Sequence, residues 1–148
     1  MTSTFLNTIP IMRIFDVVKA KDFYVRFLGF AVDWEHRFDN DSPVYLQISK
    51  GDLILHLSEH HGDCCPGSTV FVWMKGIEDF HDTITSRGYG YMRPGIEQTF
   101  YNSICVEVTD PFGNRIRFNE VQRKEPEDIE QSADDDASVA DRGVDLAK

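Results

Sequence analysis

The chain carries the same series of local signals twice, and this internal repeat limits the folds that it can adopt. Residues 16–28 and 76–87 each place apolar side chains at the three- and four-residue spacing of an amphipathic helix. Each stretch ends at a glycine followed by an aromatic residue, Gly29-Phe30 and Gly88-Tyr89, 59 residues apart. Asp16 is the expected N-cap of the first helix. A repeat of this length predicts two copies of one supersecondary unit.

Strand patterns surround each expected helix in the same order. One strand candidate precedes the helix and three follow it, and a turn-forming stretch, Lys50-Gly51-Asp52 or 110–114, precedes the last strand of each set. The candidates are Ile9–Ile14, Ala31–Arg37, Val44–Ser49 and Leu53–Ser58, then Thr69–Met74, Tyr91–Pro94 (the weakest), Ile104–Thr109 and Arg115–Asn119. The sequence therefore predicts an α+β domain over residues 5–122, built from tandem βαβββ modules at about 8–60 and 68–121.

Composition narrows the class of protein. The 148 residues suffice for one ordinary domain. Net charge is −10, from 25 acidic and 15 basic residues, which argues against a nucleic-acid partner. Residues 123–148 are polar and acidic, and we expect this tail to be disordered. The sequence shows neither a signal peptide nor an apolar run long enough for a membrane helix, and three cysteines make no disulfide framework. We therefore expect a cytoplasmic protein.

Four stretches together resemble the bleomycin-resistance branch of the glyoxalase, or vicinal-oxygen-chelate, superfamily. They are Ile9-Pro10-Ile11; the helix with Phe23-Tyr24 that ends Leu28-Gly29-Phe30; the segment 72–78, Val-Trp-Met-Lys-Gly-Ile-Glu; and the segment 110–115, Asp-Pro-Phe-Gly-Asn-Arg. The resemblance covers nearly the whole domain. It implies an open, cup-shaped mixed sheet with helices outside, and a homodimer that exchanges N-terminal strands and holds ligand crevices at its interface.

The resemblance also implies where metalloenzymes of this superfamily take their metal ligands. The inferred positions are Ile9, His56, Thr69 and Arg117. Of these, His56 alone is a good ligand for a divalent metal, while a catalytic site needs about three protein ligands. We therefore expect no metal, no cofactor and no enzymatic activity. The alternative is a metal-dependent lyase or dioxygenase of the superfamily that supplies its ligands in another way.

Other chemistry has weaker support in the sequence. His56, His60 and His61 lie near Cys64 and Cys65 and form either an incidental metal site or, as we expect, a solvated loop. No nucleophile motif and no glycine-rich phosphate loop is found. Asp33 and Glu35 lie one strand period apart, so they are an acid–base pair, an anionic wall facing a ligand, or a solvated strand edge.

Residues for binding a flat ligand are better represented. Strand alternation sets Leu53, Leu55 and Leu57 against the helices and turns His56 and Ser58 towards the cup, with Arg117 as the repeat partner of His56. The resemblance adds Trp34, Phe38 and Trp73 as aromatic residues, and Tyr101-Asn102 stands where relatives have Trp-Gly. Core packing is the alternative for each aromatic side chain. In a regular strand Trp34 faces away from both Asp33 and Glu35, so all three meet one ligand only if the segment twists or bulges.

These features favour a binding protein over an enzyme. Stacking residues beside acidic groups suit a cationic, heteroaromatic small molecule such as bleomycin, and sequestration of that antibiotic gives resistance without catalysis. A binder of another flat cation, with the same fold, is the second alternative within this class.

Overall fold

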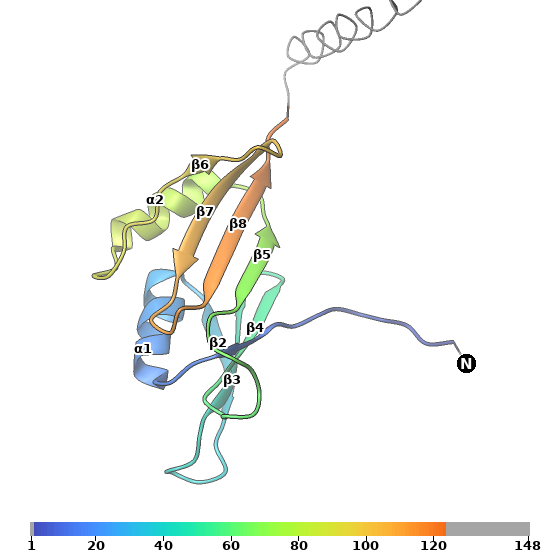
Figure 1. Cartoon of the computed structure of the whole chain (residues 1–148), viewed down its shortest axis with the longest axis vertical. Helices are drawn as coiled ribbons and strands as arrows, with labels where there is room; N and C mark the ends of the chain where they lie inside the picture. The colour runs from blue at the N-terminus through green and yellow to red at the C-terminus, as the bar shows by residue number, and fades with distance from the viewer. Residues whose placement is uncertain (1, 124–148) are drawn as a thin grey trace, which may run out of the picture.

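A computed structural model describes residues 2–123, and the expected acidic tail lies outside them except for its first residue. The two modules follow one another along the chain (Figure 1). The first contains β1 (Ile11–Arg13), α1 (Val17–Lys21), the π-helix η1 (Asp22–Phe27), β2 (Ala31–His36), β3 (Tyr45–Lys50) and β4 (Leu53–Ser58). The second contains β5 (Thr69–Trp73), α2 (Ile77–Arg87), β6 (Glu97–Gln98), β7 (Ser103–Thr109) and β8 (Arg115–Val121).

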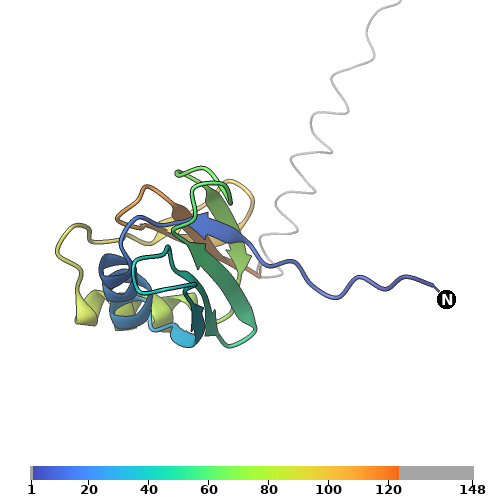
Figure 2. The same cartoon turned by 90° about the horizontal axis from the view of Figure 1, so that it is seen from below.

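Each module forms a four-stranded mixed sheet. Sheet A has the order β1-β4-β3-β2 and sheet B the order β5-β8-β7-β6, so the two sheets repeat one topology. The first and last strands of each module pair in parallel, and the remaining pairs are antiparallel. The helices lie together on one side of the sheets, while the N-terminal arm (residues 2–10) extends away from the body (Figures 1 and 2). The expected α+β fold of tandem βαβββ modules is confirmed.

The core lies between the helices and the sheets. From the first module it contains Phe23, Tyr24 and Phe27 of the helix, which pack with alternate residues of β3 and β4 such as Leu46 and Leu55. The second module repeats the arrangement with α2, β7 and β8. Leu55 and Leu57 are buried and Leu53 is partly buried, so the leucine face of β4 packs as its alternation predicts.

The first helix changes its hydrogen-bonding pattern halfway along. The Asp16 side chain accepts a hydrogen bond from the Lys19 backbone N–H at 2.9 Å, so Asp16 is the N-cap. The Leu28 N–H then donates to the Phe23 carbonyl at 2.9 Å, five residues earlier, as in a π-helix. Periodicity predicts a single α-helix over 16–28, which is wrong for its second half. The wider turn allows the adjacent residues Phe23 and Tyr24 both to be fully buried.

Two expected strands differ from those observed. β1 begins only at Ile11, because Pro10 lacks the N–H that a strand would use and contributes only its carbonyl, which accepts from the His56 N–H. The expected strand at 91–94 is absent from the described structure. Its place beside β7 is taken by the two-residue strand β6, and Tyr91 is 89% exposed. Pro94, which cannot donate to a neighbouring strand, ends the stretch for the same reason.

A buried polar cluster joins the modules. The Tyr24 hydroxyl donates to the Asp110 carboxylate at 2.7 Å, and the Asn114 side chain donates to Asp110 at 2.8 Å and to the Arg13 carbonyl at 2.7 Å. Burial raises the pKa of Asp110, and the hydrogen bonds that it accepts oppose this rise. Burial and the Asp110 charge raise the pKa of Tyr24 well above its usual value. The cluster fixes the helix of module one against the 110–114 turn of module two.

Candidate functional site

The side of sheet A that faces away from the helices, its helix-free face, carries the first group of candidate residues. The register of β2 against β3 shifts between Val32 and Trp34, which is a β-bulge with Asp33 as the extra residue. Asp33 nevertheless accepts hydrogen bonds from Gln47 Nε2 at 3.0 Å and Ser49 Oγ at 2.9 Å. Trp34 pairs with Gln47 in register. The bulge therefore places the neighbouring residues Asp33 and Trp34 on the same face.

Glu35 lies on the opposite side of β2. Its carboxylate forms an ion pair with Lys21 of α1 at 2.7 Å, and both side chains are 40% exposed. In register Glu35 opposes Leu46, which is buried under the helix. Of the two carboxylates expected near Trp34, the structure therefore brings only Asp33 to its face.

Trp34 belongs to a cluster of rings. Its indole stacks on Tyr45 with 5.9 Å between ring centroids and 11° between planes, and it meets the His56 ring edge-on at 5.4 Å. Trp34 remains 43% exposed, so the alternative of core packing does not describe it. The cluster extends through His60 to Phe38, which is 78% exposed beyond the end of β2.

His56 lies at the centre of this face with both ring nitrogens in hydrogen bonds. Nδ1 lies 2.7 Å from the Tyr45 hydroxyl, and Nε2 lies 2.9 Å from Gln47 Oε1. Desolvation by burial lowers the pKa of His56 and raises that of Tyr45, so both neutral forms are favoured. A neutral histidine with two such partners has no free lone pair for a metal.

The strand register bears on the remaining metal positions. Ile11 lies beside His56, and Phe71 lies beside Arg117, where the sequence suggested Ile9 and Thr69. Neither Ile11 nor Phe71 has a donor atom, so the change of register adds no ligand. Among residues 2–123, no group of three or more His, Cys, Asp or Glu side chains is arranged to hold a metal ion. These residues do not fit the metal of the superfamily's enzymes.

Ser58 is not exposed on the helix-free face of sheet A. It is fully buried, and its hydroxyl donates to Asp63 and accepts the His60 backbone N–H at 3.0 Å. The side chain holds the loop after β4 in place.

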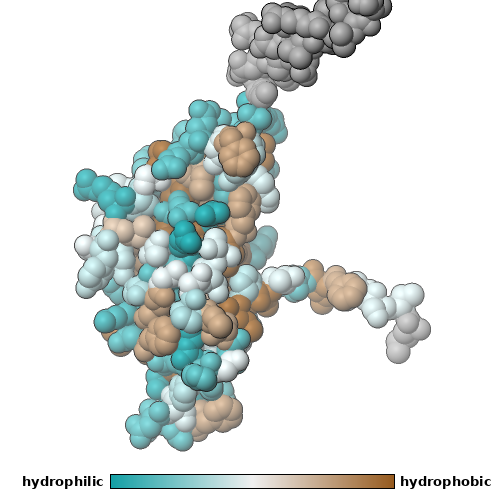
Figure 3. Space-filling view, in the orientation of Figure 1, coloured by the Kyte–Doolittle hydropathy of each residue, from teal (hydrophilic) through white to brown (hydrophobic). Residues whose placement is uncertain are grey.

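The helix-free face of sheet B carries a second set of exposed rings. Val70, Val72 and Met74 pack against the core, so the alternate residues Phe71 and Trp73 point to the other side. The Phe71 and Trp73 rings meet edge-on at 4.9 Å, and Phe71 lies 6.3 Å from Tyr101. Figure 3 shows hydrophobic side chains along the edge of the body from which the N-terminal arm departs.

Polar contacts fix the rest of this second face. The Tyr101 hydroxyl, on a ring that is 40% exposed, donates to Asn119 Oδ1 at 3.1 Å. Asn102 adopts a positive φ of 54° at the tight turn before β7. Arg117 donates to Glu107 at 2.7 Å, and this hydrogen bond and the Glu107 charge raise its pKa.

Sheets A and B thus carry separate aromatic faces. Within the described residues, no ring of the cluster around Trp34 contacts a ring of the second set, Phe71, Trp73 and Tyr101. Residues Tyr45, Gln47 and Phe71 were not among the expected site residues. Strand alternation in β3 was the available signal for the first two, since Val44, Leu46 and Ile48 are the buried positions.

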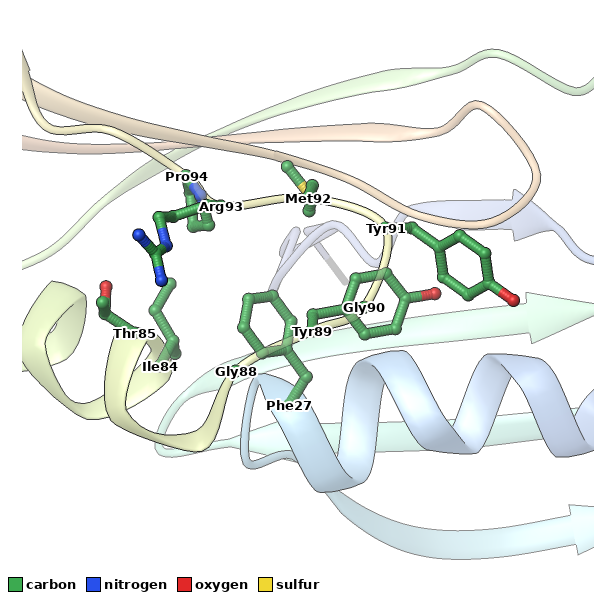
Figure 4. A pocket seen from close by; sticks show the side chains of 10 residues that line it. All are labelled: Phe27, Ile84, Thr85, Gly88, Tyr89, Gly90, Tyr91, Met92, Arg93 and Pro94. Carbon is green, nitrogen blue, oxygen red and sulfur yellow. The ribbon is translucent and has the colours of Figure 1, made fainter.

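Two depressions lie elsewhere, on the helical side. One, of about 370 Å³, lies between the end of α2 and the 88–94 loop, where Tyr89 stacks on Phe27 (Figure 4). A second, of about 1070 Å³, is bounded by the first helix and the turns at 89–92 and 109–112. Neither is lined by an expected site residue, and both lie behind the sheets relative to the aromatic faces. No helix in the described part of the chain has the length and apolar character needed to cross a membrane.

Residues 2–123 thus form a pair of βαβββ modules with two aromatic helix-free faces. A family model described as "Glyoxalase superfamily protein" matches residues 2–125, and the chain belongs to that superfamily. A comparison with curated proteins found no match.

Solved structures share the fold at low sequence identity. A bleomycin-binding protein complexed with bleomycin is 21% identical, with a TM-score of 0.62 over 81% of this chain and 100% of that one. A bleomycin resistance determinant encoded on the transposon Tn5 is 20% identical, with a TM-score of 0.63 over 80% and 100%. A glyoxalase-related enzyme from Clostridium phytofermentans is 18% identical, with a TM-score of 0.63 over 80% and 97%. At these identities the likeness concerns the fold, which binders and enzymes share.

Proposed function

We propose that this protein binds and sequesters a bleomycin-type glycopeptide antibiotic and confers resistance without catalysis. The observation that carries the proposal is the bulge in β2, which sets the Asp33 carboxylate beside the exposed Trp34 ring on one face. Bleomycin-type ligands combine positive charge with a flat heteroaromatic tail. A carboxylate and an adjacent indole suit both parts of such a molecule.

The donor set supports binding rather than metal-dependent catalysis. His56 is the one good ligand among the superfamily's four metal positions, and both of its ring nitrogens have hydrogen-bond partners. Elemental analysis after dialysis is expected to find no stoichiometric transition metal. One tightly held nickel, zinc, iron or manganese ion per chain, lost on His56→Ala, would instead favour a metal-dependent lyase or dioxygenase.

The proposal includes a homodimer with exchanged N-terminal strands. The arm leaves the body at Pro10 and leaves Phe5 and Leu6 97% and 90% exposed, which is unusual for large apolar side chains in an isolated subunit. In the proposed dimer the face of sheet A from one subunit meets that of sheet B from its partner, so Trp34 and Tyr101 line opposite walls of each crevice. Light scattering should give about twice the chain mass of 17.0 kDa. A mass of one chain across a range of concentrations would refute this part.

Calorimetric titration with bleomycin, both metal-free and copper-loaded, tests the function. We expect saturable binding, and Trp34→Ala should weaken it about threefold to tenfold, since one stacking contact contributes about 0.5–1.5 kcal/mol beyond burial. Tyr101→Ala should act similarly. Tyr91→Ala is the matched control, because that ring is 89% exposed and lies on the helical side. Equal affinity in all variants would remove both rings from the site.

A further inference from the structure

The helix-free face of sheet A contains a continuous chain of hydrogen bonds whose direction has chemical consequences. The chain runs Ser49–Asp33–Gln47–His56–Tyr45 across three strands. The exposed Trp34 ring and this hydrogen-bond chain together form one wall of the proposed crevice, the Trp34 wall. We propose that the hydrogen-bond chain makes the Trp34 wall selective for flat cations that carry N–H donors, and that Asp33 determines this selectivity. The inference rests on the proposed function and adds to it the chemical class of ligand group that the Trp34 wall accepts.

The direction of the chain follows from Asp33. Carboxylate oxygens accept hydrogen bonds, so the Gln47 amide nitrogen, 3.0 Å from Asp33 Oδ2, is the donor there. Gln47 Oε1 therefore faces His56 Nε2 at 2.9 Å. An amide oxygen accepts only, so Nε2 carries the imidazole hydrogen. Nδ1 then holds the lone pair, and the Tyr45 hydroxyl donates to it at 2.7 Å.

The consequence is a wall richer in acceptors than in donors. The hydroxyl hydrogens of Ser49 and Tyr45 and the His56 N–H are used within the chain, while the oxygens of Tyr45 and Asp33 keep lone pairs. The donors that the chain does not use are the Trp34 indole N–H and the second amide hydrogen of Gln47. Asp33 supplies the negative charge beside Trp34, because Glu35 is turned away and paired with Lys21, while Asp63 adds negative charge at the Tyr45 end of the chain.

A ligand group that matches this wall has three properties. It is flat, so that it stacks on the exposed Trp34 ring. It is positively charged, so that the Asp33 carboxylate attracts it. It carries N–H groups at its rim, so that the oxygens of Asp33 and Tyr45 accept from it. A hydrogen bond to a charged group contributes about 1.5–3 kcal/mol, which is roughly tenfold or more in affinity.

Three probes of one size and shape separate these properties. Aminoacridinium is a flat cation with N–H donors, N-methylacridinium is a flat cation without them, and anthracenecarboxylate is a flat anion. In calorimetric titrations of the full chain, we expect aminoacridinium to bind about tenfold or more tightly than N-methylacridinium. Anthracenecarboxylate should bind most weakly.

Asp33→Asn and Glu35→Gln provide a matched pair of variants. Each removes one negative charge from β2 without changing side-chain shape, but the two residues lie on opposite faces. Asp33→Asn should reduce the preference for aminoacridinium to about threefold or less, and Glu35→Gln should leave it unchanged. Thermal denaturation of both variants checks that the fold is retained. A purely structural role for Asp33 would lower affinity for both cations equally and leave their ratio unchanged.

The proposal is overturned if the wild-type protein binds both cations equally or binds neither, or if Asp33→Asn keeps the preference. It is also overturned if Glu35→Gln loses the preference to the same extent. Bleomycin is titrated in parallel. Bleomycin binding without discrimination between the acridines refutes the selectivity and leaves the proposed function standing. Discrimination without bleomycin binding supports the wall and refutes the antibiotic as ligand.

Discussion

Replacing Tyr24 with phenylalanine tests the buried contact that joins the modules. The Tyr24 ring is fully buried, and its hydroxyl donates to Asp110, which is 5% exposed, at 2.7 Å. Phenylalanine fills the same space, so the substitution removes the hydrogen bond and leaves packing intact. Asp110 keeps its bonds from Asn114 and from the Phe112 backbone. Loss of one hydrogen bond to an ionised group costs about 1.5–3 kcal/mol.

For a domain of this size such a loss lowers the melting temperature by roughly 6–12 °C. Chemical and thermal denaturation measure both quantities. The Tyr24 hydroxyl lowers the pKa of Asp110 against the larger effect of burial, which raises it. Tyr24→Phe should therefore raise the pKa of Asp110 further, so its cost should be full above the pKa of Asp110 in the variant and should shrink as the pH falls from there to the pKa of Asp110 in the wild-type fold.

Tyr91→Phe is the control, because that side chain is 89% exposed, and it should change stability by less than about 0.5 kcal/mol. A cost below about 0.5 kcal/mol for Tyr24→Phe, or a cost that does not depend on pH, would show that the buried contact does not hold the two modules together as argued.

Three further outcomes follow from local geometry. Gly29 (φ 84°) and Gly51 (φ 57°) both occupy the left-handed region, so alanine at either should cost about 1–2 kcal/mol. In chemical denaturation Gly29→Ala should cost about 1 kcal/mol more than Gly51→Ala, because its Cβ would lie within 2.8 Å of the Arg87 and Lys50 side chains. These two side chains donate hydrogen bonds to carbonyls at the end of the first helix. Equal costs for the two variants would show that these contacts are unimportant. Burial lowers the pKa of His56 below 6.5, so the unfolded chain binds a proton at this residue more readily than the folded chain does. The free energy of unfolding should therefore fall as the pH drops from 6.5 towards the pKa of His56 in the folded protein. His56→Gln should reduce the slope of the free energy of unfolding against pH. An unchanged slope would contradict the shift. Glu35→Ala should change stability by about 1 kcal/mol at most and leave bleomycin binding unaltered in calorimetry, and weakened binding would place Glu35 in the site after all.

Much of the fold could be predicted because burial imposes regular spacing. The leucines of β4 and the glycine exits of both helices follow directly from periodicity. The π-helical turn could not be predicted, since Phe23-Tyr24 fits an α-helical stripe equally well. The partner of the Tyr24 hydroxyl, Asp110, lies 86 residues away, so local spacing does not show this contact either.

The site was less predictable than the fold for a related reason. Alternation assigns Asp33 and Trp34 to opposite faces, and only pairing with β3 shows the bulge that unites them. Glu35 lies two residues after Asp33, so alternation assigns both to one face, whereas the bulge places them on opposite faces. The ion pair of Glu35 with Lys21 depends on how the helix packs against the sheet. Tyr45 and Gln47 were on the correct face by alternation, but nothing in their residue types marks a hydrogen-bond chain through His56.

The single extra residue in β2 has a consequence for how the chemistry of this face can change. Because side chains alternate along a strand, deleting one residue at the bulge would restore strict alternation and separate the carboxylate from the indole in one step. A one-codon insertion or deletion could therefore exchange an anionic stacking wall for a neutral one, while the leucine-lined core behind β4 stays in place. Length variation in β2, more than point substitution, is where related sequences with a different ligand preference should be sought.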